Sequence, residues 1–138
     1  PEIDVIARKG HSWGETEKVV ERVNAGTDCK ICMYELADQV QMKKSIEDSA
    51  ILVNASSVGM SPHEDSCLVP DQTFFHPELI VSDVIYNPRK TKLLRMAEGV
   101  GCSTFNGMYM LLYQGAYAFE LWTGHEMPVG LVKEKYFS

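Results

Sequence analysis

The stretch ILVNASSVGM, residues 51–60, decides the fold that we predict for this sequence. Its first three residues are apolar and uncharged, which is typical of a strand buried on both faces of a parallel sheet. Small polar residues then lead to Gly59, which permits a turn that a Cβ atom would hinder. In open α/β sheets, ligands bind just beyond the carboxyl ends of the strands. The stretch therefore predicts a strand that delivers a small polar loop to a crevice, although on this stretch alone an ordinary strand-to-loop junction is the simpler interpretation.

The size and charge of the chain limit its class and its partners. With 138 residues, of which 45% are hydrophobic and 23% charged, it is long enough for one soluble domain with its own core. The formal net charge of -6 disfavours a nucleic-acid surface, which needs clustered Lys and Arg. The longest apolar runs are far too short to span a bilayer. We therefore expect neither nucleic acid nor a membrane as a partner.

The first residues and the cysteines bear on the cellular compartment. Protein synthesis begins with methionine, so we expect a chain that begins at Pro1 to be an internal piece of a longer protein. Residues 1–10 carry mixed charge and no apolar h-region, unlike a signal peptide. Cys29 and Cys32 form a C-x-x-C within an expected strand, where they point to opposite faces, and no second C-x-x-C or His pair completes a zinc set. We therefore expect no metal site, reduced thiols and a cytoplasmic location.

Apolar periodicity predicts strands that alternate with helices along the chain. Strands are expected at residues 3–7, 29–34, 51–53, 79–82 and 102–105, and helices at residues 13–24, 35–47, 90–100, 107–122 and 128–136. The helix at 107–122 has Glu120 as its only ionised residue, so we expect it to be buried on almost every side. The residues expected to face the core are Val19, Val20 and Val23 of the first helix, Leu36, Val40 and Ile46 of the second, and Leu93, Leu94 and Ala97 of the third.

This alternation indicates βαβ units and therefore a parallel sheet. We predict an α/β fold: a Rossmann-like parallel sheet with helices on both faces, followed by carboxyl-terminal helices. A dinucleotide fold also needs a Gly-rich turn after its first strand, yet no G-x-G-x-x-G is present, and Gly99 and Gly101 follow a helix. We therefore expect the first βα unit to be missing. Because strand 1 is central in the usual 3-2-1-4-5-6 order, its absence leaves a gap between the strands at 3–7 and 51–53.

Three segments of the chain, at residues 53–60, 83–91 and 107–116, carry motifs that resemble those of the shikimate dehydrogenase family. Residues 53–60, VNASSVGM, are similar to the family's N-A-T-S-x-G-M, and residues 83–91, DVIYNPRKT, are similar to its D-x-x-Y-N-P-x-x-T. Residues 107–116, GMYMLLYQGA, followed by Phe119, Trp122 and Gly124, resemble its G-x-x-M-L-x-x-Q-x-A…F…W-x-G helix. Residues 22–29, RVNAGTDC, and the W-T-G at 122–124 are features of the shikimate/quinate branch. The likeness covers the whole chain, as the family's carboxyl-terminal half.

The resemblance implies an oxidoreductase in which one domain binds the coenzyme and another carries the acid/base pair. It implies hydride transfer between NADP(H) and 3-dehydroshikimate or shikimate, in aromatic amino-acid biosynthesis. Residues 1–138 would be an NAD(P)-binding Rossmann-like domain, incomplete at its amino end, with residues 107–138 as helices that pack toward a substrate domain outside the chain. The family's Lys and Asp acid/base pair lies on that other domain and has no counterpart here. We therefore assign no catalytic residue to this chain and expect the chain alone to be inactive.

Other interpretations stay open beside this one. The full protein could be a quinate/shikimate dehydrogenase that uses NAD(H), or another dinucleotide-binding reductase with the same fold. The chain could also be a fragment or interaction module with no activity of its own. An apolar helix face left exposed would invite association, so a homodimer is among the expected states.

The residues after the first expected strand bear on the choice of coenzyme. At this place in a Rossmann fold an acidic residue bonds the ribose 2′-OH of NAD, whereas basic residues accept the 2′-phosphate of NADP. The resemblance puts Ala7 where the family usually has Asn, and Arg8 at its Arg. Gly10 replaces an Asp that is frequent in the dual-specificity branch, and Lys9 adds a charge. We therefore expect Ala7, Arg8 and Lys9 to bind NADP, with NAD as the alternative; two merely solvated cations are the simpler interpretation.

The resemblance implies further site residues at the nicotinamide and substrate end. Tyr86 and Gln114 are the expected substrate contacts, since a polyol carboxylate needs neutral donors and acceptors. Gln114 is a lone amide among apolar residues, so we expect it to be buried and to bond either substrate or a structural partner. Asp83 is expected to bond loop backbone, and Thr91 to be an N-cap. The remaining cofactor-binding residues implied are Ser56, Ser57, Val84, Ile85, Tyr86, Asn87 and Gly107, the last because it lets backbone approach the ring.

Overall fold

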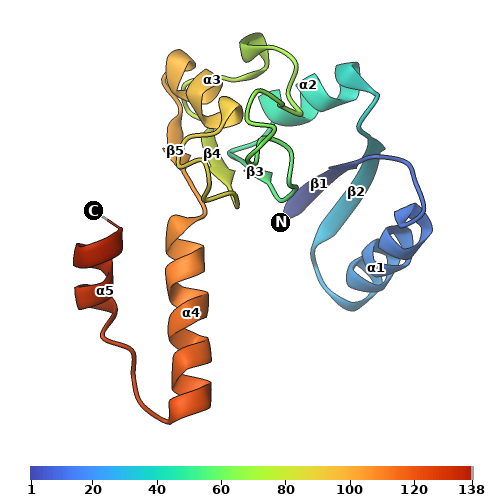
Figure 1. Cartoon of the computed structure of the whole chain (residues 1–138). Coiled ribbons are helices and arrows are strands. Elements are labelled where there is room, and N and C mark those ends of the chain that lie inside the picture. Colours follow the sequence, from blue (N-terminus) through green and yellow to red (C-terminus); the bar gives the residue numbers. More distant parts are fainter. Residues whose placement is uncertain (138) are drawn as a thin grey trace. The chain divides into compact units, whose positions relative to one another are not determined.

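Within residues 1–137, which the structure describes, every paired strand runs parallel to its neighbour. Figure 1 shows this computed structural model, in which the chain forms two units, Pro1–Ser49 and Ala50–Ser138. The strands make two sheets, one of order β1-β2 and one of order β3-β4-β5. Among the described residues, no strand pairs with both β1 and β3. The predicted α/β class with parallel strands is confirmed.

The first unit is a βαβ unit followed by a helix. β1 (Glu2–Ala7) and β2 (Lys30–Glu35) pair in parallel, and α1 (Trp13–Gly26) connects them. Asn24, in the last part of α1, fixes the helix to the sheet: its side-chain amide donates to the carbonyl of Ile31 at 2.9 Å, and its Oδ1 accepts from the Ile31 amide at 2.7 Å. The two bonds satisfy both polar atoms of the Asn24 side chain with one residue of β2.

The second helix of this unit, α2 (Gln39–Glu47), begins later than expected. The side chain of Asp38 caps it by accepting from the Gln41 amide at 2.9 Å, which favours a helix start at this point. Met42 and Ile46 are buried, as expected for Ile46, whereas Val40 is exposed. The prediction that Val40 faces the core was wrong: Met42 and Ile46, four residues apart, define the buried face of the helix, and Val40 lies on the other side. α1 has no buried residue; Val20 and Val23 are half-buried, but Val19 is exposed.

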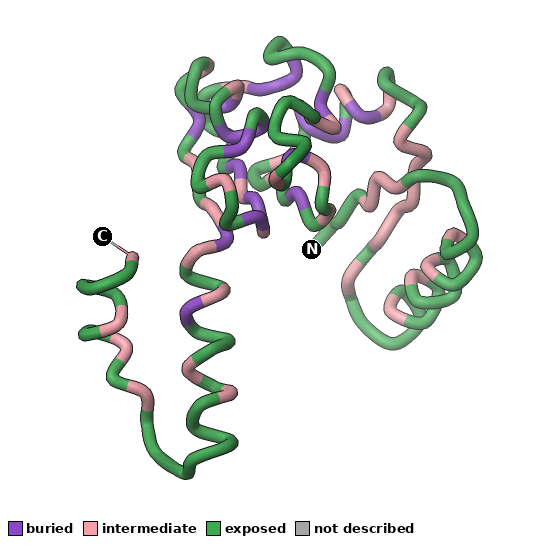
Figure 2. The backbone as a smooth tube through the Cα atoms, viewed as in Figure 1, coloured by how far each residue is buried: buried purple, intermediate pink, exposed green. Residues whose placement is uncertain are grey.

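The second unit holds the three-stranded sheet and its covering helix. β3 (Ile51–Asn54), β4 (Ile80–Asp83) and β5 (Ser103–Phe105) pair in sequence order, and a 3-10 turn, η1 (Gln72–Phe74), lies in the long connection before β4. α3 (Lys92–Val100) contacts β4, β5 and η1. The expected core residues Leu93, Leu94 and Ala97 are all buried, and Figure 2 shows buried residues, in purple, in α3 and β4 as well as in other parts of the chain.

The strand β3 is less buried than its apolar sequence predicted. Ile51 and Val53 are 58% and 53% exposed, whereas Leu52 is half-buried and Asn54 buried. β3 lies at the edge of its sheet, and its alternate residues point to opposite faces. The prediction of burial on both faces was therefore wrong for this strand in the described chain.

The carboxyl-terminal helices form a hairpin that is mostly exposed. α4 (Met108–Thr123) and α5 (Val129–Tyr136) lie side by side in Figure 1, and the Lys133 ammonium sits 4.9 Å from the centre of the Tyr109 ring. Leu112 is the buried residue of α4, whereas Leu121 and Trp122 are 83% and 81% exposed. The expectation that this helix is buried on almost every side was wrong, because an apolar sequence does not itself supply a covering element. No helix of residues 1–137 is long and apolar enough to cross a membrane.

Candidate functional site

Three polar side chains from the sequence motifs meet at the carboxyl ends of β3 and β4. Asp83, the last residue of β4, accepts from the hydroxyl of Thr91 at 2.7 Å, the side-chain amide of Asn54 at 3.1 Å and the backbone amide of Ile85 at 3.0 Å. Asp83 and Thr91 are each 1% exposed. Thr91 also caps α3 by accepting from the Leu94 amide at 3.4 Å, so both predicted structural roles are confirmed. A buried carboxylate is stable when its oxygens are hydrogen-bonded, and this one fixes the loops after both strands.

The loop after β3 is held by its own polar groups. Oδ1 of Asn54 accepts from the amide of Ser56 at 3.1 Å and from its hydroxyl at 2.7 Å, and the Val58 amide donates to that hydroxyl at 3.1 Å. Gly59 has φ +99, and a Cβ atom there would lie 3.2 Å from the carbonyl oxygen of Ser66. The turn predicted at Gly59 is therefore confirmed. The Ser56 hydroxyl already has two partners inside the loop, whereas Ser57 is exposed.

The segment after β4 divides into a buried part and an exposed part. The Val84 amide donates to the carbonyl of Asn54 at 3.1 Å, and Ile85 is buried. Tyr86 and Asn87, which follow, are exposed at the carboxyl end of the strand. Of the cofactor-binding residues expected in this segment, Tyr86 and Asn87 are thus exposed, whereas Ile85 is buried in the core. Their contact with a cofactor stays a prediction.

Gly107 has a role in packing that the sequence did not predict. Its amide donates to the carbonyl of Ile85 at 3.0 Å, just before α4 begins. A Cβ atom at this position would lie 1.9 Å from the carbonyl oxygen of Val84. The segment after β4 and the start of α4 therefore approach so closely that only glycine fits. The predicted approach of Gly107 to a nicotinamide ring stays a prediction beside this packing role.

The position of Gln114 differs from the expected one. It lies in α4 and is exposed, so its amide faces no burial cost within the described chain. The expectation of a buried amide was wrong because the neighbouring apolar residues of α4 are themselves largely exposed. Exposure leaves its amide accessible to a ligand or to another domain. Its predicted contact with substrate stays a prediction.

The residues expected to choose the coenzyme lie in the first unit, at the carboxyl end of β1. Ala7 ends the strand and is half-buried, and Arg8 and Lys9 follow it and are exposed. The ammonium group of Lys9 forms an ion pair with the Glu35 carboxylate at 2.7 Å and lies 5.9 Å from the centre of the Trp13 ring. The hydrogen bond and charge of Glu35 raise the pKa of Lys9 above its ordinary value. Sequence reasoning did not single out Glu35, although its place at the end of β2 is a signal that could have found it.

The thiols and potential metal ligands of residues 1–137 form no compact cluster. No group of three or more His, Cys, Asp or Glu side chains in this part of the chain could hold a metal ion. The cysteines Cys29, Cys32, Cys67 and Cys102 are free thiols. Burial raises the pKa of the Cys67 and Cys102 thiols.

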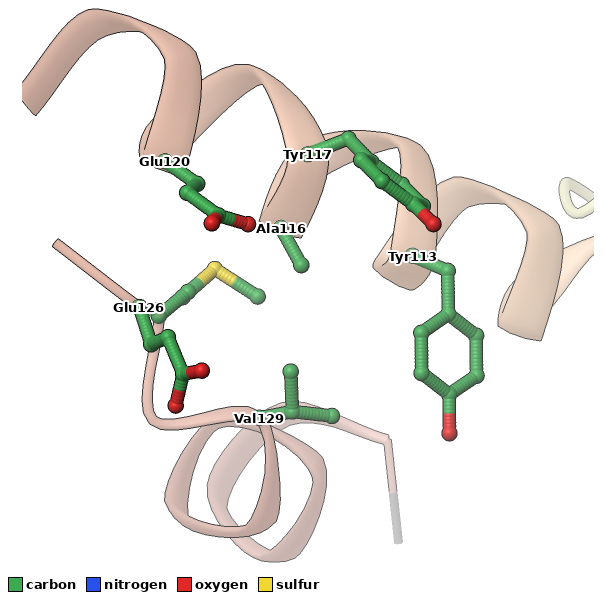
Figure 3. A pocket seen from close by; sticks show the side chains of 7 residues that line it. Tyr113, Ala116, Tyr117, Glu120, Glu126 and Val129 are labelled. Atoms are coloured by element: carbon green, nitrogen blue, oxygen red, sulfur yellow. The ribbon is translucent and has the colours of Figure 1, made fainter. Parts of the chain in front are cut away.

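A groove between α4 and α5 was not predicted from the sequence. In Figure 3, Tyr113, Tyr117 and Glu120 of α4 lie opposite Glu126 and Val129 of the following segment. It contains none of the residues expected to contact coenzyme or substrate. Its lining residues are Tyr113, Ala116, Tyr117, Glu120, Glu126, Met127 and Val129.

Parallel βαβ units with exposed polar residues after β1, β3 and β4 give this chain a Rossmann-like α/β fold. Comparison with known proteins narrows the class. The family model for the Shikimate 5'-dehydrogenase C-terminal domain matches residues 107–135. A curated shikimate dehydrogenase (NADP(+)) of Listeria monocytogenes is 48% identical over 136 residues, covering 99% of this chain and 47% of the relative. One of Streptococcus uberis is 43% identical over 138 residues, with 99% and 47% covered.

Comparison with solved structures finds similarity to the same group of enzymes. The shikimate 5-dehydrogenase of Listeria monocytogenes, in complex with shikimate and NAD, matches with a TM-score of 0.88 and 49% identity, covering 96% of this chain and 46% of that one. The quinate dehydrogenase of Corynebacterium glutamicum, in complex with NAD, has a TM-score of 0.75 at 21% identity, which is a likeness of fold, over 99% of this chain and 55% of that one. Over nearly its whole length the chain is therefore similar to the corresponding part of known shikimate dehydrogenases. It spans about half the length of the curated relatives it matches.

Proposed function

We propose that this chain is the nucleotide-binding half of an NADP-dependent shikimate dehydrogenase of aromatic amino-acid biosynthesis, acting in the cytoplasm. The observation that carries the proposal is the loop after β4. Hydrogen bonds to Asp83 fix its start, and its exposed end presents a phenol at Tyr86 and an amide at Asn87. Such neutral donors and acceptors suit a polyol carboxylate and the carboxamide of a nicotinamide. High identity over nearly the whole chain to shikimate dehydrogenases supports the same function.

The residues of the chain fit a nicotinamide coenzyme. Such a coenzyme, when bound, supplies or accepts the hydride. Arg8 and Lys9 are exposed cations directly after Ala7, the last residue of β1, and they suit a 2′-phosphate. Ser57, after β3, is exposed, and the loop that carries it is ordered through the bonds of Ser56. We assign the nicotinamide end to the segment of Val84, Ile85, Tyr86 and Asn87, with Gly107 packed against its backbone.

The other functions of the enzyme are assigned to the part of the protein that this chain does not span. We infer that the acid/base pair lies there, and that the substrate is held between that part and the exposed side chains of Tyr86 and Gln114. The exposed apolar residues of α4, Leu121 and Trp122 among them, are assigned to the interface with that part.

A second copy of the protein is the alternative partner for this apolar surface of α4. Light scattering of the natural protein distinguishes a monomer from a homodimer.

An enzyme assay of the natural protein that contains this chain tests the proposal. The protein is mixed with shikimate and NADP, and formation of NADPH is followed by absorbance. Parallel reactions replace NADP by NAD and shikimate by quinate. Reduction of NADP that depends on shikimate is the expected result, and it ranks above the other three combinations in kcat/KM. No turnover with either coenzyme would contradict the proposed activity, and a clear preference for NAD would contradict the assigned coenzyme.

A further inference from the structure

The ends of β1 and β2 place an acidic residue beside one of the two cations expected to bind NADP. The two strands are in register at Ala7 and Glu35, and the Leu36 amide donates to the Ala7 carbonyl at 2.8 Å. Arg8 and Lys9 follow directly after Ala7. Both strands therefore deliver their next side chains to the same edge of the sheet, which is the edge at which nucleotides bind in this class of fold.

Lys9 forms an ion pair with the carboxylate of Glu35 at this edge of the sheet. Its ammonium lies 2.7 Å from a Glu35 carboxylate oxygen, and the two side chains are 67% and 43% exposed. The Trp13 ring lies 5.9 Å from the ammonium, and its own Nε1 donates to Glu17 at 2.8 Å. Lys9 is therefore held between a carboxylate and an aromatic ring, with Glu17 as the next acidic neighbour.

The ion pair affects NADP and NAD differently. The 2′-phosphate of NADP adds negative charge where Arg8 and Lys9 would bind it. To reach this phosphate, the ammonium of Lys9 must leave the Glu35 carboxylate or be shared with it. NAD has a 2′-hydroxyl in place of the phosphate and does not need the cation. Competition for Lys9 therefore weakens the binding of NADP alone.

We propose that Glu35 is a residue that determines coenzyme specificity, because it holds Lys9 and so reduces the preference for NADP over NAD. This inference rests on the proposed function, since it requires a nicotinamide dinucleotide at this edge. Glu35 acts through Lys9 and touches neither the hydride nor the substrate. The strength of the pair sets the expected size of the effect, because ion pairs between exposed side chains are modest and screened by salt.

Binding of NADP and NAD to the natural protein, measured by calorimetry at low salt, tests the inference. Glu35→Gln is expected to tighten NADP binding about two- to fivefold while the Kd for NAD changes less than about 1.5-fold. Lys9→Met is expected to weaken NADP binding and leave NAD binding unchanged. In the double variant, removing the carboxylate should have no further effect on NADP, because there is no ammonium left to release.

The chain offers a matched control at the opposite end of the same two strands. Lys30 and Glu2 form an ion pair at 3.0 Å between β2 and β1, with side chains that are 68% and 76% exposed. Glu2→Gln removes an equivalent charge at the amino ends of the strands, away from the expected nucleotide edge. It should leave the ratio of the two Kd values unchanged.

The outcomes separate this inference from the proposed function. If the natural protein binds neither dinucleotide, the proposed function is wrong and the inference falls with it. If both bind, but Glu35→Gln leaves the ratio of Kd values unchanged or weakens NADP, the inference is wrong and the proposed function stands. If the effect of Glu35→Gln persists in full in the Lys9→Met protein, Glu35 does not act by holding Lys9, and the inference is again overturned.

Discussion

Thr91 donates its hydroxyl hydrogen to Asp83 over 2.7 Å, and both residues are 1% exposed. This bond joins the carboxyl end of β4 to the amino end of α3, because Asp83 is the last residue of the strand and Thr91 is the N-cap of the helix. The same carboxylate also accepts from Asn54 at the end of β3. One buried carboxylate therefore connects three elements around the loop that presents Tyr86.

Thr91→Val should destabilise the natural protein by about 1–3 kcal/mol, because it leaves a buried carboxylate oxygen without its donor and removes a helix cap. Urea denaturation measures the change, and Thr91→Ser should restore most of the loss by restoring the hydroxyl. Thr123→Val is the control: the Thr123 hydroxyl donates to the Phe119 carbonyl at 2.7 Å, but the residue is exposed. Equal losses at both positions would contradict the role given to the Asp83 bond.

Gly107→Ala should cost at least about 3 kcal/mol or abolish soluble folded protein, since backbone must move to admit the new methyl group. The added Cβ atom would lie 1.9 Å from the Val84 carbonyl oxygen. Gly115→Ala in α4 is the control, because no atom of residues 1–137 lies within 4 Å of its Cβ position, and it should stabilise the helix by up to about 1 kcal/mol. Thermal denaturation compares the two variants. A Gly107→Ala protein with the stability of wild type would refute the close approach.

Local chemistry in the sequence predicted several of these features correctly. The N-cap at Thr91, the structural role of Asp83, the turn at Gly59 and the buried face of α3 follow from side-chain preferences within a few residues. Each depends on interactions over a short stretch of chain or on a strong apolar period. Features of this kind can be predicted from the sequence alone.

The features that could not be predicted depend on what lies next to an element. α4 is apolar in sequence, but Leu121 and Trp122 are exposed because no part of the described chain covers them. Gln114 shares this exposure, so its apolar neighbours in sequence did not make a buried site. The pairing of Lys9 with Glu35 joins the residues that follow β1 to the last residue of β2, and the register of the two strands brings these positions together. The periodicity of a sequence identifies the apolar or polar face of an element, but it does not identify the part of the protein that packs against that face.

The thiols of the chain should differ in their rates of alkylation. Burial raises the pKa of Cys102, which lowers its thiolate fraction at a given pH, and its Sγ–H donates to the carbonyl of His76 at 3.2 Å. We expect iodoacetamide at pH 8 to modify Cys102 at least about tenfold more slowly than Cys29, because the thiolate is the nucleophile. Raising the pH should speed the reaction at Cys102. Mass spectrometry of proteolytic peptides gives both rates, and equal rates would contradict the burial of Cys102.

Gln114→Ala should lower kcat/KM for shikimate about tenfold or more in the natural protein, which corresponds to about 1.4 kcal/mol of lost transition-state stabilisation. The exposure of Gln114 makes this a clean test, because truncating an exposed amide should change the free energy of unfolding by less than about 0.5 kcal/mol. A loss of activity without a loss of stability then points to a contact with substrate. Gln39→Ala, which truncates another exposed glutamine at the start of α2, should change neither quantity. If Gln114→Ala and Gln39→Ala have the same kcat/KM, the amide of Gln114 does not bind substrate, and the proposed substrate contact reduces to Tyr86.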